Sequence, residues 1–541
     1  MAGSHAILRT DATVSLGVPM GRRVRILILL ISVASRAAAF FSSYDLFDPV
    51  YGDLSSWELA GLIPRLPRLR PYPPQFIDRM LQIVVESGGK DAERARHYLV
   101  GTGQLVRTRF VAETQIRVDS GGLFFGNLSP SVATRLDTPG VDADGRYTMN
   151  LLDSTDGLIL PAYDRAERDW VPDWAEFDLF DRSISIRQNL ASNLSVGDAV
   201  RWFQFGIGRS SIGPFYHDGL ALSRSAPSSI HLSFTWHTAQ LSGQFLQAEL
   251  TATDDAGGGR YPDKRLVLHS ITWRPLSWFA LDFYDSVVYG NRFDLRYLIP
   301  ISSLYLTQGI AGFVDNALIG LGFEFRPFQW LSIPVSVYAD DVHFNDLIRL
   351  DFETKYKLSF QVGASANPPW LHEIDRVSID YLAVMPYMYS HRDQDDTTVP
   401  NFSNYTQSGA SLGPSLEPNS DRLSFRISGR PIKPIRLVAY FEAIRHGNPS
   451  TGFTSGDGTV FDDGYDNEGQ PTFQSETRFL IQDLIEQTAK AGLTSTLSVR
   501  VRGFEISAVA GYTFTYSRNV GLIEGETESV HTFELSVGTR F

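Results

Sequence analysis

The residue types best suited to acid–base chemistry gather at Asp340, Asp341 and His343. A carboxylate beside a histidine could act as the general acid–base pair of a hydrolase or protease. Adjacent residues of a strand point to opposite faces, however, so Asp341 and His343 would share a side of the strand that Asp340 does not. The chain also contains no His-Glu-x-x-His stretch of the kind that binds catalytic zinc. We therefore predict no catalytic residues and no enzymatic activity.

A second candidate for chemistry is the acidic segment 456–469, in which carboxylates lie among glycines. Carboxylate oxygens are the ligands that hard cations prefer, but the spacing here is not that of a calcium-binding loop. We predict a solvated acidic loop, with no metal site and no cofactor. The acidic residues of this segment are Asp457, Asp462, Asp463, Asp466 and Glu468.

The composition of the 541-residue chain excludes several classes of protein. The chain has no Cys, which excludes a disulfide-stapled fold, a thiolate zinc site and a Cys nucleophile. Its net charge of −13 argues against nucleic acid as a partner, because binding phosphates needs a basic surface. Aromatic residues make up 12% of the chain while hydrophobic residues make up 43%, so the excess is aromatic rather than hydrophobic.

The N-terminus carries a targeting segment. Three arginines between positions 22 and 25 precede an apolar run over 26–34 and three alanines at 37–39. This is the pattern of a secretory signal peptide, and the apolar run is about half of the roughly 20 residues that a transmembrane helix needs. We predict that residues 1–39 are a signal peptide. Met20 stands just before the arginines, so residues 1–19 could precede the true start.

Residues 40–103 form the helical part of the chain. The sequence Ser55 to Glu58 matches a capping box, which predicts that a short helix begins there. Apolar residues recur at helical spacing over 76–85, and a third helix is expected over 91–100. So few apolar residues give only a marginal core. We therefore predict a small module that docks on a larger body.

From residue 104 to the C-terminus the sequence alternates in the manner of β-strands. In 503–517 the even positions from Phe504 to Tyr516 are apolar, whereas the odd positions are mostly polar. An exported chain with many alternating strands of about 10 residues matches an outer-membrane β-barrel, because closure leaves no backbone group unpaired in lipid. We predict that 104–541 is a transmembrane antiparallel β-barrel in the outer membrane of a Gram-negative-type (diderm) bacterium.

Turn chemistry predicts which ends of the strands face the periplasm. Arg-Pro turns at 274–278, 326–330 and 430–434 alternate with long polar connections such as 388–421 and 446–474. Pro cannot donate to a sheet ladder, so each Arg-Pro sequence marks a turn. Outer-membrane barrels have short periplasmic turns and long outer loops. The Arg-Pro turns and the helical module are therefore expected on the periplasmic side.

Counting back from the C-terminus gives eighteen strands, the even number needed if both ends of the barrel lie in the periplasm. The segment 475–487 is assigned to an outer connection or to the extension of a neighbouring strand. The predicted strands lie near 107–118, 129–136, 145–152, 181–190, 199–206, 228–237, 241–253, 264–274, 278–288, 317–326, 331–341, 356–366, 376–387, 422–430, 435–445, 488–501, 503–517 and 530–541.

The last strand ends on an aromatic residue, Phe541. This ending resembles the signal that the barrel-insertion machinery reads. We expect deletion of Phe541 to reduce insertion sharply, because the machinery would no longer recognise the last strand. The measurement is the amount of folded, heat-modifiable protein in the membrane fraction, and an unchanged amount would count heavily against the barrel.

Four stretches along the chain carry a family resemblance. The most specific reads Gly-Ile-Gly-Arg-Ser-Ser-Ile-Gly-Pro at 206–214 and continues with Asp-Gly-Leu-Ala-Leu-Ser at 218–223 and Ala-Pro at 226–227. Three weaker patches also match, and all four occur along the chain in an order consistent with the family. The weaker patches are 59–63 with 70–72, then 289–290 with 315–316 and 340–341, and finally 389–391 with 409 and 412–413. Together they resemble the Wzi-type capsule-assembly outer-membrane proteins over most of the mature chain.

The resemblance implies a large barrel with a small periplasmic helical module, and a role in organising or attaching capsular polysaccharide at the cell surface. One position departs from the family pattern, because Ile212 stands where the family usually has an aromatic residue. The family-like loop residues are Gly208, Arg209, Gly213, Pro214, Asp218 and Gly219.

A polysaccharide site is expected on the outer loops, since sugars stack on aromatic rings and donate hydrogen bonds to carboxylates. The candidate residues are Tyr389, His391, Asp393, Asp395, Asp396, Tyr405, Asp462, Asp463 and Tyr465. The expected partners are outer-membrane lipid, the barrel-insertion machinery and surface polysaccharide.

The alternative function is an outer-membrane diffusion channel or transporter, for which the acidic balance would favour cations. A barrel of this size is wide enough for an aqueous channel. Long outer connections nevertheless supply enough chain to occlude the lumen from outside, at 153–180, 207–227, 289–316, 388–421 and 446–487.

Overall fold

The computed structural model describes residues 41–540 outside these internal segments: 100–104, 121–123, 154–172, 180–181, 216, 255–257, 301, 311, 313, 341–356, 392–399, 433, 448–457, 462–478, 482–483 and 502–503. The predicted signal peptide, residues 1–39, and the C-terminal Phe541 therefore lie outside the described residues. In the described part of the chain, no helix is both long and apolar enough to cross a membrane.

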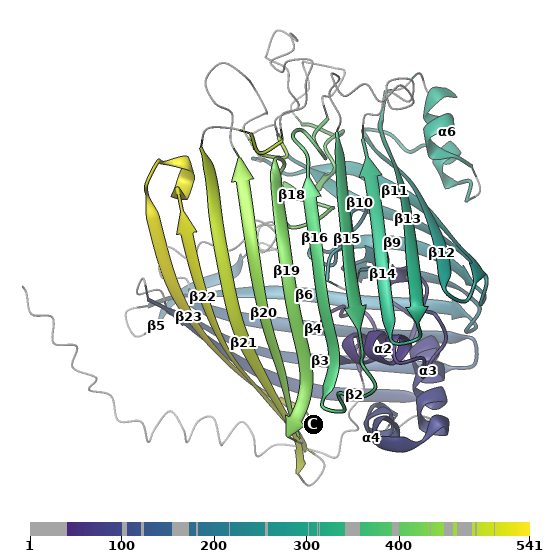
Figure 1. The fold of residues 1–541 in the computed structure, drawn as a ribbon, viewed down its shortest axis with the longest axis vertical. Coiled ribbons are helices and arrows are strands. Elements are labelled where there is room, and N and C mark those ends of the chain that lie inside the picture. Colours follow the sequence, from purple (N-terminus) through teal and green to yellow (C-terminus); the bar gives the residue numbers. More distant parts are fainter. Residues whose placement is uncertain are drawn as a thin grey trace, which may run out of the picture.

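The chain forms a closed antiparallel β-barrel of eighteen strands (Figure 1), and each strand predicted from the sequence is present. The ring closes where the first and last strands pair, with Glu113 opposite Gly538. Its strands are β2 (Val106–Asp119), β3 (Phe124–Thr138), β4 (Val141–Asp153), β6 (Arg182–Gly197), β7 (Arg201–Gly208), β9 (Ser229–His237), β10 (Leu241–Ala252), β11 (Tyr261–Leu276), β12 (Phe279–Gly290), β13 (Asn316–Phe328), β14 (Leu331–Ala339), β15 (Leu358–Ala366), β16 (Ile374–Val384), β19 (Ser420–Ile432), β20 (Ile435–Gly447), β21 (Ile485–Val501), β22 (Phe504–Arg518) and β23 (Thr527–Arg540).

One further strand, β5 (Asp173–Leu179), lies within the connection 153–180 that the sequence assigned to an outer loop. It pairs with the first residues of β6, from Arg182 to Arg187. On the same edge, β7 pairs only with the last residues of β6. The short β7 leaves the first residues of β6 without a partner on this edge. An exposed strand edge presents unpaired backbone groups, and β5 supplies the missing partner there.

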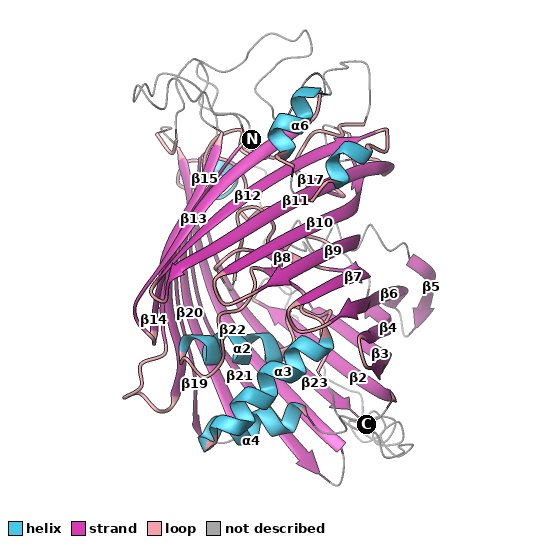
Figure 2. Ribbon diagram, turned by 90° about the vertical axis from the view of Figure 1, so that its right-hand side faces the viewer, coloured by secondary structure: helices cyan, strands magenta, loops and turns pink. Residues whose placement is uncertain are grey.

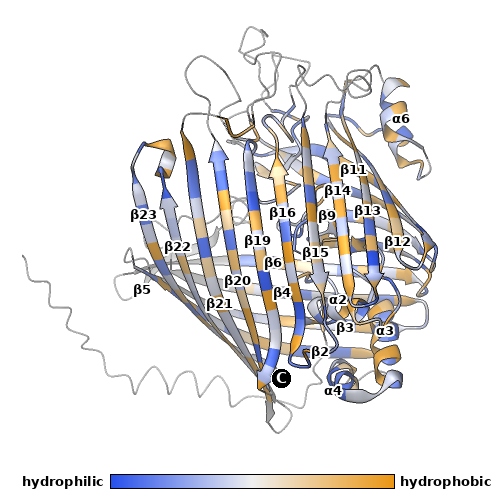
Figure 3. Ribbon diagram, in the orientation of Figure 1, coloured by the Kyte–Doolittle hydropathy of each residue, from blue (hydrophilic) through white to orange (hydrophobic). Residues whose placement is uncertain are grey.

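Hydrophobic and hydrophilic residues alternate along the strands (Figure 3), and their side chains point in turn to the outside of the barrel and to the lumen, as the sequence period predicted. On β7, the outward Phe203 and Phe205 are each 56% exposed, whereas the inward Trp202 and Gln204 are buried. Outward apolar side chains of this kind form a belt around the barrel, which suits contact with lipid. The lumen side is polar and, over much of the barrel, covered by other parts of the chain.

The N-terminal module contains α2 (Pro49–Leu59), α3 (Pro74–Ser87) and α4 (Gly89–Tyr98). The capping-box prediction is wrong, because α2 begins earlier: Asp48 precedes Pro49 and its carboxylate accepts a hydrogen bond from the amide of Val50 (3.0 Å). Proline is favoured in the first turn of a helix, so Asp48-Pro49 is the stronger start signal. The predicted second helix is confirmed, ending at Gly88.

The module occupies the mouth of the barrel at the end where β23 finishes (Figures 1 and 2). Its core is shared with the barrel wall, since the ring of Phe76 packs on that of the inward Trp202 with centroids 5.1 Å apart. Buried ion pairs add to the docking, such as Arg135 of β3 with Asp78 of α3 (2.5 Å). The expected larger body is therefore the barrel itself.

The three Arg-Pro turns lie at this same end of the barrel and hold the module. Arg274 donates to the carbonyl of Leu66 (3.0 Å), and Arg326 donates to the carboxylate of Glu58 (2.8 Å). The arginine of the third turn, Arg430, pairs with Asp53 of α2 (3.1 Å). The turns, the module and the end of β23 thus share one side, as the turn chemistry predicted.

Of the long connections at the opposite end of the barrel, some fold into the lumen and one packs on the outside of the wall. The described residues of 209–228 and of 385–419 enter the lumen, and their apolar side chains join one buried cluster with the inner faces of β10–β14 and β16. The connection 291–315 lies instead against the outside of the wall, so its predicted contribution to a lid over the lumen is wrong.

Candidate functional site

The family-like loop leaves the wall after Gly208 and forms part of a plug inside the lumen. Its short strand β8 (Ser211–Ile212) pairs with β1 (Leu69–Arg70) of the N-terminal module. Arg209 fastens the loop on itself by donating to the carbonyls of Ser225 (3.0 Å) and Ala226 (3.3 Å). The loop and the module therefore form one continuous plug.

Two glycines of this loop are required by its backbone. Gly213 has φ +128°, a conformation that side-chain-bearing residues rarely adopt. A Cβ at Gly219 would lie 2.5 Å from the carbonyl oxygen of Ile212 and 2.6 Å from that of Leu222. The conservative explanation for these family-like glycines is therefore chain packing within the lumen.

Asp218 ties the loop to the barrel wall. Its carboxylate accepts from Arg422 of β19 (2.6 Å) and from the hydroxyl of Ser223 (2.5 Å). All three side chains are buried or nearly so. Pro214, in the same loop, lines a cavity on the lumen side of the wall.

Tyr389 and Tyr405 are not on the outer surface, so the prediction that they offer exposed ring faces to a sugar is wrong. Both are fully buried in the lumen. Their hydroxyls donate to the carbonyls of Leu220 (2.8 Å) and Ala221 (2.7 Å) in the family-like loop. Burial raises the pKa of Tyr405 to about 12, so its phenol is protonated and serves as a donor. The tyrosines lock the two inward connections together.

The other predicted polysaccharide residues are divided between the described and undescribed parts of the chain. His391 is half-buried, with its Nδ1 3.8 Å from the carboxylate of Asp340. Asp341 and His343, which were considered as an acid–base pair, lie outside the described residues, as does most of the acidic segment 456–469. So do Asp393, Asp395, Asp396, Asp462, Asp463 and Tyr465.

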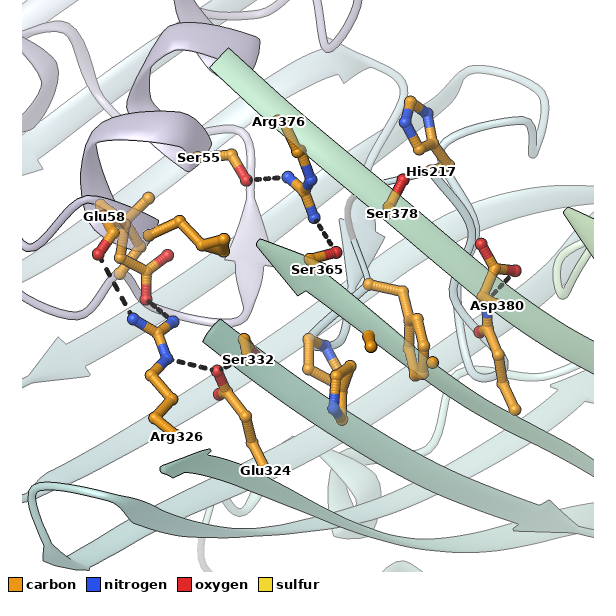
Figure 4. Close-up of a pocket in the computed structure, with 18 of the residues that line it drawn as sticks. Ser55, Glu58, His217, Glu324, Arg326, Ser332, Ser365, Arg376, Ser378 and Asp380 are labelled. Atoms are coloured by element: carbon orange, nitrogen blue, oxygen red, sulfur yellow. Dashed lines mark hydrogen bonds and ion pairs between the residues drawn. The ribbon is translucent and has the colours of Figure 1, made fainter. Parts of the chain in front are cut away.

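A cavity lies between α2, the family-like loop and the inner faces of β13–β16 (Figure 4). The cavity has a volume of about 30 Å³, which is room for a few water-sized groups. The sequence did not single out this site, because its residues come from segments more than 300 positions apart. Its polar lining includes Ser55, Glu58, Arg68, Arg70, His217, Glu324, Arg326, Gln361, Ser365, Arg376, Ser378 and Asp380.

Buried charges on one side of this cavity form a compact network. Glu324 accepts from Arg68 (2.7 Å) and Arg326 (2.7 Å), while Arg326 also donates to Glu58. Burial alone would raise the pKa of Glu58, but the charges of Arg326, Arg65 and Arg68 together outweigh it and hold that pKa below its usual value. Glu58 is therefore ionised at neutral pH and holds α2 against the wall.

The opposite side of the cavity carries Arg376 and His217. Arg376 donates to the hydroxyls of Ser55 (2.5 Å) and Ser365 (2.9 Å). Burial, together with the nearby Arg426, holds the pKa of His217 well below its usual value, so its ring is neutral. The arrangement offers hydroxyl, amide and guanidinium groups, which suit hydrogen bonding within the plug or to a molecule of the size of water rather than proton transfer.

The described part of the plug leaves part of the lumen wall uncovered. The inward-facing side chains of β20–β22 are partly exposed rather than buried, in contrast with those of β9–β12. Tyr440, Glu442 and Lys490 are examples. The described residues therefore fill the barrel unevenly, and the inner faces of β20–β22 are less covered than those of β9–β12.

One sequence motif matches that of a catalytic serine, but the structure around it does not. Residues 409–413 read Gly-Ala-Ser-Leu-Gly, the spacing of a nucleophile elbow, but an elbow needs a turn from strand to helix. Ser411 lies instead in β18 (Ala410–Ser411), paired with β17 (Thr406–Gln407). Among the described residues, no three His, Asp or Glu side chains are placed to hold a metal ion.

The geometry defines a class: an eighteen-stranded barrel of outer-membrane type with a plug in its lumen. No protein-family model matches the chain, and no curated protein matches it. Among solved structures the chain is similar to Wzi, an outer-membrane protein involved in group 1 capsule assembly in Escherichia coli and described as a carbohydrate-binding β-barrel. The identity is 13% over 91% of this chain and 97% of that chain, with a TM-score of 0.57.

The chain is also similar to two barrels of Pseudomonas aeruginosa. For OprD the identity is 8% over 81% of this chain and 95% of that chain, with a TM-score of 0.43. For OccD3 (OpdP) the identity is 9% over 81% of this chain and 91% of that chain, with a TM-score of 0.42. At such identities the similarity shows the fold alone.

Proposed function

We propose that this protein is an outer-membrane barrel that organises or attaches surface polysaccharide at its outer face. The observation that carries the proposal is the plug. Three separate parts of the chain meet inside the lumen and bury apolar residues there: the helical module and the described residues of the connections 209–228 and 385–419. A barrel whose lumen is filled by this much of its own chain is better suited to presenting its outer loops than to passing large solutes.

The overall plan supports the same proposal. The carbohydrate-binding barrel Wzi combines a comparable fold with a role in capsule assembly, and the family-like loop 206–227 has a defined structural role in this chain. The binding surface would be formed by the outer connections that carry His391, Asp393, Asp462 and Tyr465. Tyr389 and Tyr405 would support these loops from below.

A diffusion channel is the second candidate function. The observation that favours it is the partly exposed lumen face of β20–β22, which bears polar and charged side chains. Such a lining suits small hydrophilic solutes and ions.

Replacing residues 392–399 and 462–470 with Gly-Ser sequences of equal length should release surface polysaccharide into the medium. The replacement removes Asp393, Asp462 and Tyr465 but keeps Asn401 and Asn404, which bond to the carbonyl and the amide of His391. Folding should therefore persist. The measurement is the ratio of cell-bound to released polysaccharide in a strain that makes a capsule.

The matched control replaces residues 162–169, in an outer connection that carries none of the predicted contacts. Barrel abundance is measured in parallel for all variants. An unchanged ratio at normal abundance would remove the anchoring role and leave transport as the better account.

A further inference from the structure

The alternation of exposed and buried side chains breaks down on the outer half of β11 and β12. Odd-numbered residues face outward on both strands, because the even-numbered Asp282 bonds to Arg68 in the lumen. Towards the module end of β11, the outward Ile271 and Trp273 are about half exposed. Further along, the outward side chains are buried, although no strand of the barrel covers that face: Val267, His269, Asp285, Val287 and Tyr289.

The cover is the connection 291–315, which contains η1 (Leu295–Leu298) and α6 (Leu304–Ile310). Tyr297 and Leu304 pack in one cluster with Val267 and Val287 on the outside of the wall. The rings of Tyr297 and Tyr289 stack obliquely with centroids 4.9 Å apart. Figure 2 shows α6 in front of the strands near the outer rim, opposite the helical module.

Polar groups of the wall are matched to this connection. Asp285 accepts from the amide of Leu304 at the start of α6 (2.6 Å), and His269, its cross-strand neighbour, contacts the carbonyl of Ser302 through Nδ1 (3.0 Å). Nearer the rim, Arg265 donates to the carbonyl of Arg292 (2.7 Å). Polar groups facing lipid are costly unless they are paired. The wall is therefore built to receive this segment.

The outer face of the connection is apolar. Leu295, Leu306 and Ile310 are 69%, 70% and 75% exposed. The charged residues beside them are paired within the connection, Arg292 with Asp315 and Arg296 with Asp294. Further exposed apolar side chains on this face are Phe293, Ile299, Tyr305 and Val314.

We propose that residues 291–315 form a clip that lies in the outer leaflet and binds acyl chains of its lipids. The clip covers the polar part of the wall and replaces it with an apolar surface, which continues the belt formed by Ile271 and Trp273. An amphipathic segment with neutralised charges and a leucine- and isoleucine-rich face is stabilised at the boundary between headgroups and acyl chains. This inference does not depend on what the outer loops bind.

The absence of Cys from the chain makes single-cysteine labelling a direct test. The full-length variants Leu306→Cys and Ile310→Cys, each carrying a nitroxide label, are reconstituted in phosphatidylcholine vesicles. Collision of the label with oxygen reports lipid, and collision with a water-soluble nickel chelate reports water. The lipid reference is Leu321→Cys in the outward face of β13, and the water reference is Ile523→Cys in the turn between β22 and β23.

We expect labels at 306 and 310 to match the lipid reference and to give an oxygen-to-nickel ratio several-fold above the water reference. A ratio equal to the water reference would overturn the proposal. So would low collision with both reagents, which would mean that a second copy or another protein covers the clip.

A second set of variants tests the docking of the clip. Asp285→Ala removes the acceptor for the amide of Leu304 and should increase the mobility of the label at 306. Asp285→Asn keeps an acceptor oxygen and should restore the original spectrum. Equal spectra for all three chains would show that Asp285 does not hold the clip.

Discussion

Deletion of residues 41–99 is expected to turn a poorly conducting barrel into a conducting one. The module fills the mouth of the lumen at the end where β23 finishes, and the lumen face of β20–β22 behind it is partly exposed. Because barrels of this strand number enclose a channel unless they are plugged, the conductance should rise on the order of tenfold. The measurement is planar-bilayer recording of the full chain and the deletion variant.

The control for this deletion is a folding assay, because a lost barrel would also lose conductance. The deleted chain should still show the heat-modifiable shift of a closed barrel, since none of the deleted residues belongs to the barrel ladder. Equal, low conductance from two folded chains would contradict the assignment of the module as the seal. Large steady currents from the full chain would favour the channel function.

Substitution of Asp53 should undock the helical module. Asp53 is fully buried and pairs with Arg94 of α4 (3.0 Å) and Arg430 of β19 (3.1 Å). Removing one member of a buried charge network leaves the others unpaired, which costs about 3–5 kcal/mol. Asp53→Asn should therefore expose the module to protease while the barrel stays folded. Asp91→Asn is the matched control, because Asp91 also pairs with Arg94 but lies three residues away on the same helix, where such pairs contribute about 0.2–0.5 kcal/mol.

The pairing of Asp53 with Arg94 and Arg430 also predicts how docking of the module depends on pH. Burial alone would raise the pKa of Asp53, but the charges of Arg94 and Arg430 outweigh it and lower that pKa. A lowered pKa means that the stabilisation is complete above the pKa of an unfolded Asp and is lost as the pH falls through the folded value. The module should remain docked at mildly acidic pH and be released only in strong acid. Release of the module near neutral pH would contradict this assignment.

The barrel could be predicted from sequence because its signals are local. Alternation of period two, the Arg-Pro turns and the even strand count each act within a strand or a hairpin, so all eighteen strands were located. The strand β5 alternates too, with Ala175, Phe177 and Leu179 apolar between acidic residues, but its seven residues are fewer than the roughly ten of a typical barrel strand. The start of α2 was missed because a serine and a glutamate three apart also occur inside helices, whereas Asp48-Pro49 is specific to a start.

The lumen could not be predicted because its contacts join distant segments. An aromatic residue in a polar connection is expected from sequence to lie on the surface. Nothing in the sequence around Tyr389 indicates that its hydroxyl donates to the carbonyl of Leu220. A clue lay in the nearby glycines, since a Cβ at Gly413 would lie 2.6 Å from the ring of Tyr389. The clip 291–315 posed the same difficulty, because His269 and Asp285 look like loop or lumen residues until their outward direction is known.

The most direct test of the proposed function is binding of purified polysaccharide to the protein itself. The full chain and the variant replaced at 392–399 and 462–470 are reconstituted in lipid nanodiscs and titrated with surface polysaccharide from an encapsulated strain. The account predicts saturable binding by the full chain and loss of that binding in the folded variant. The absence of binding to the full chain, or equal binding by both chains, would contradict the assignment of a polysaccharide site to these outer loops.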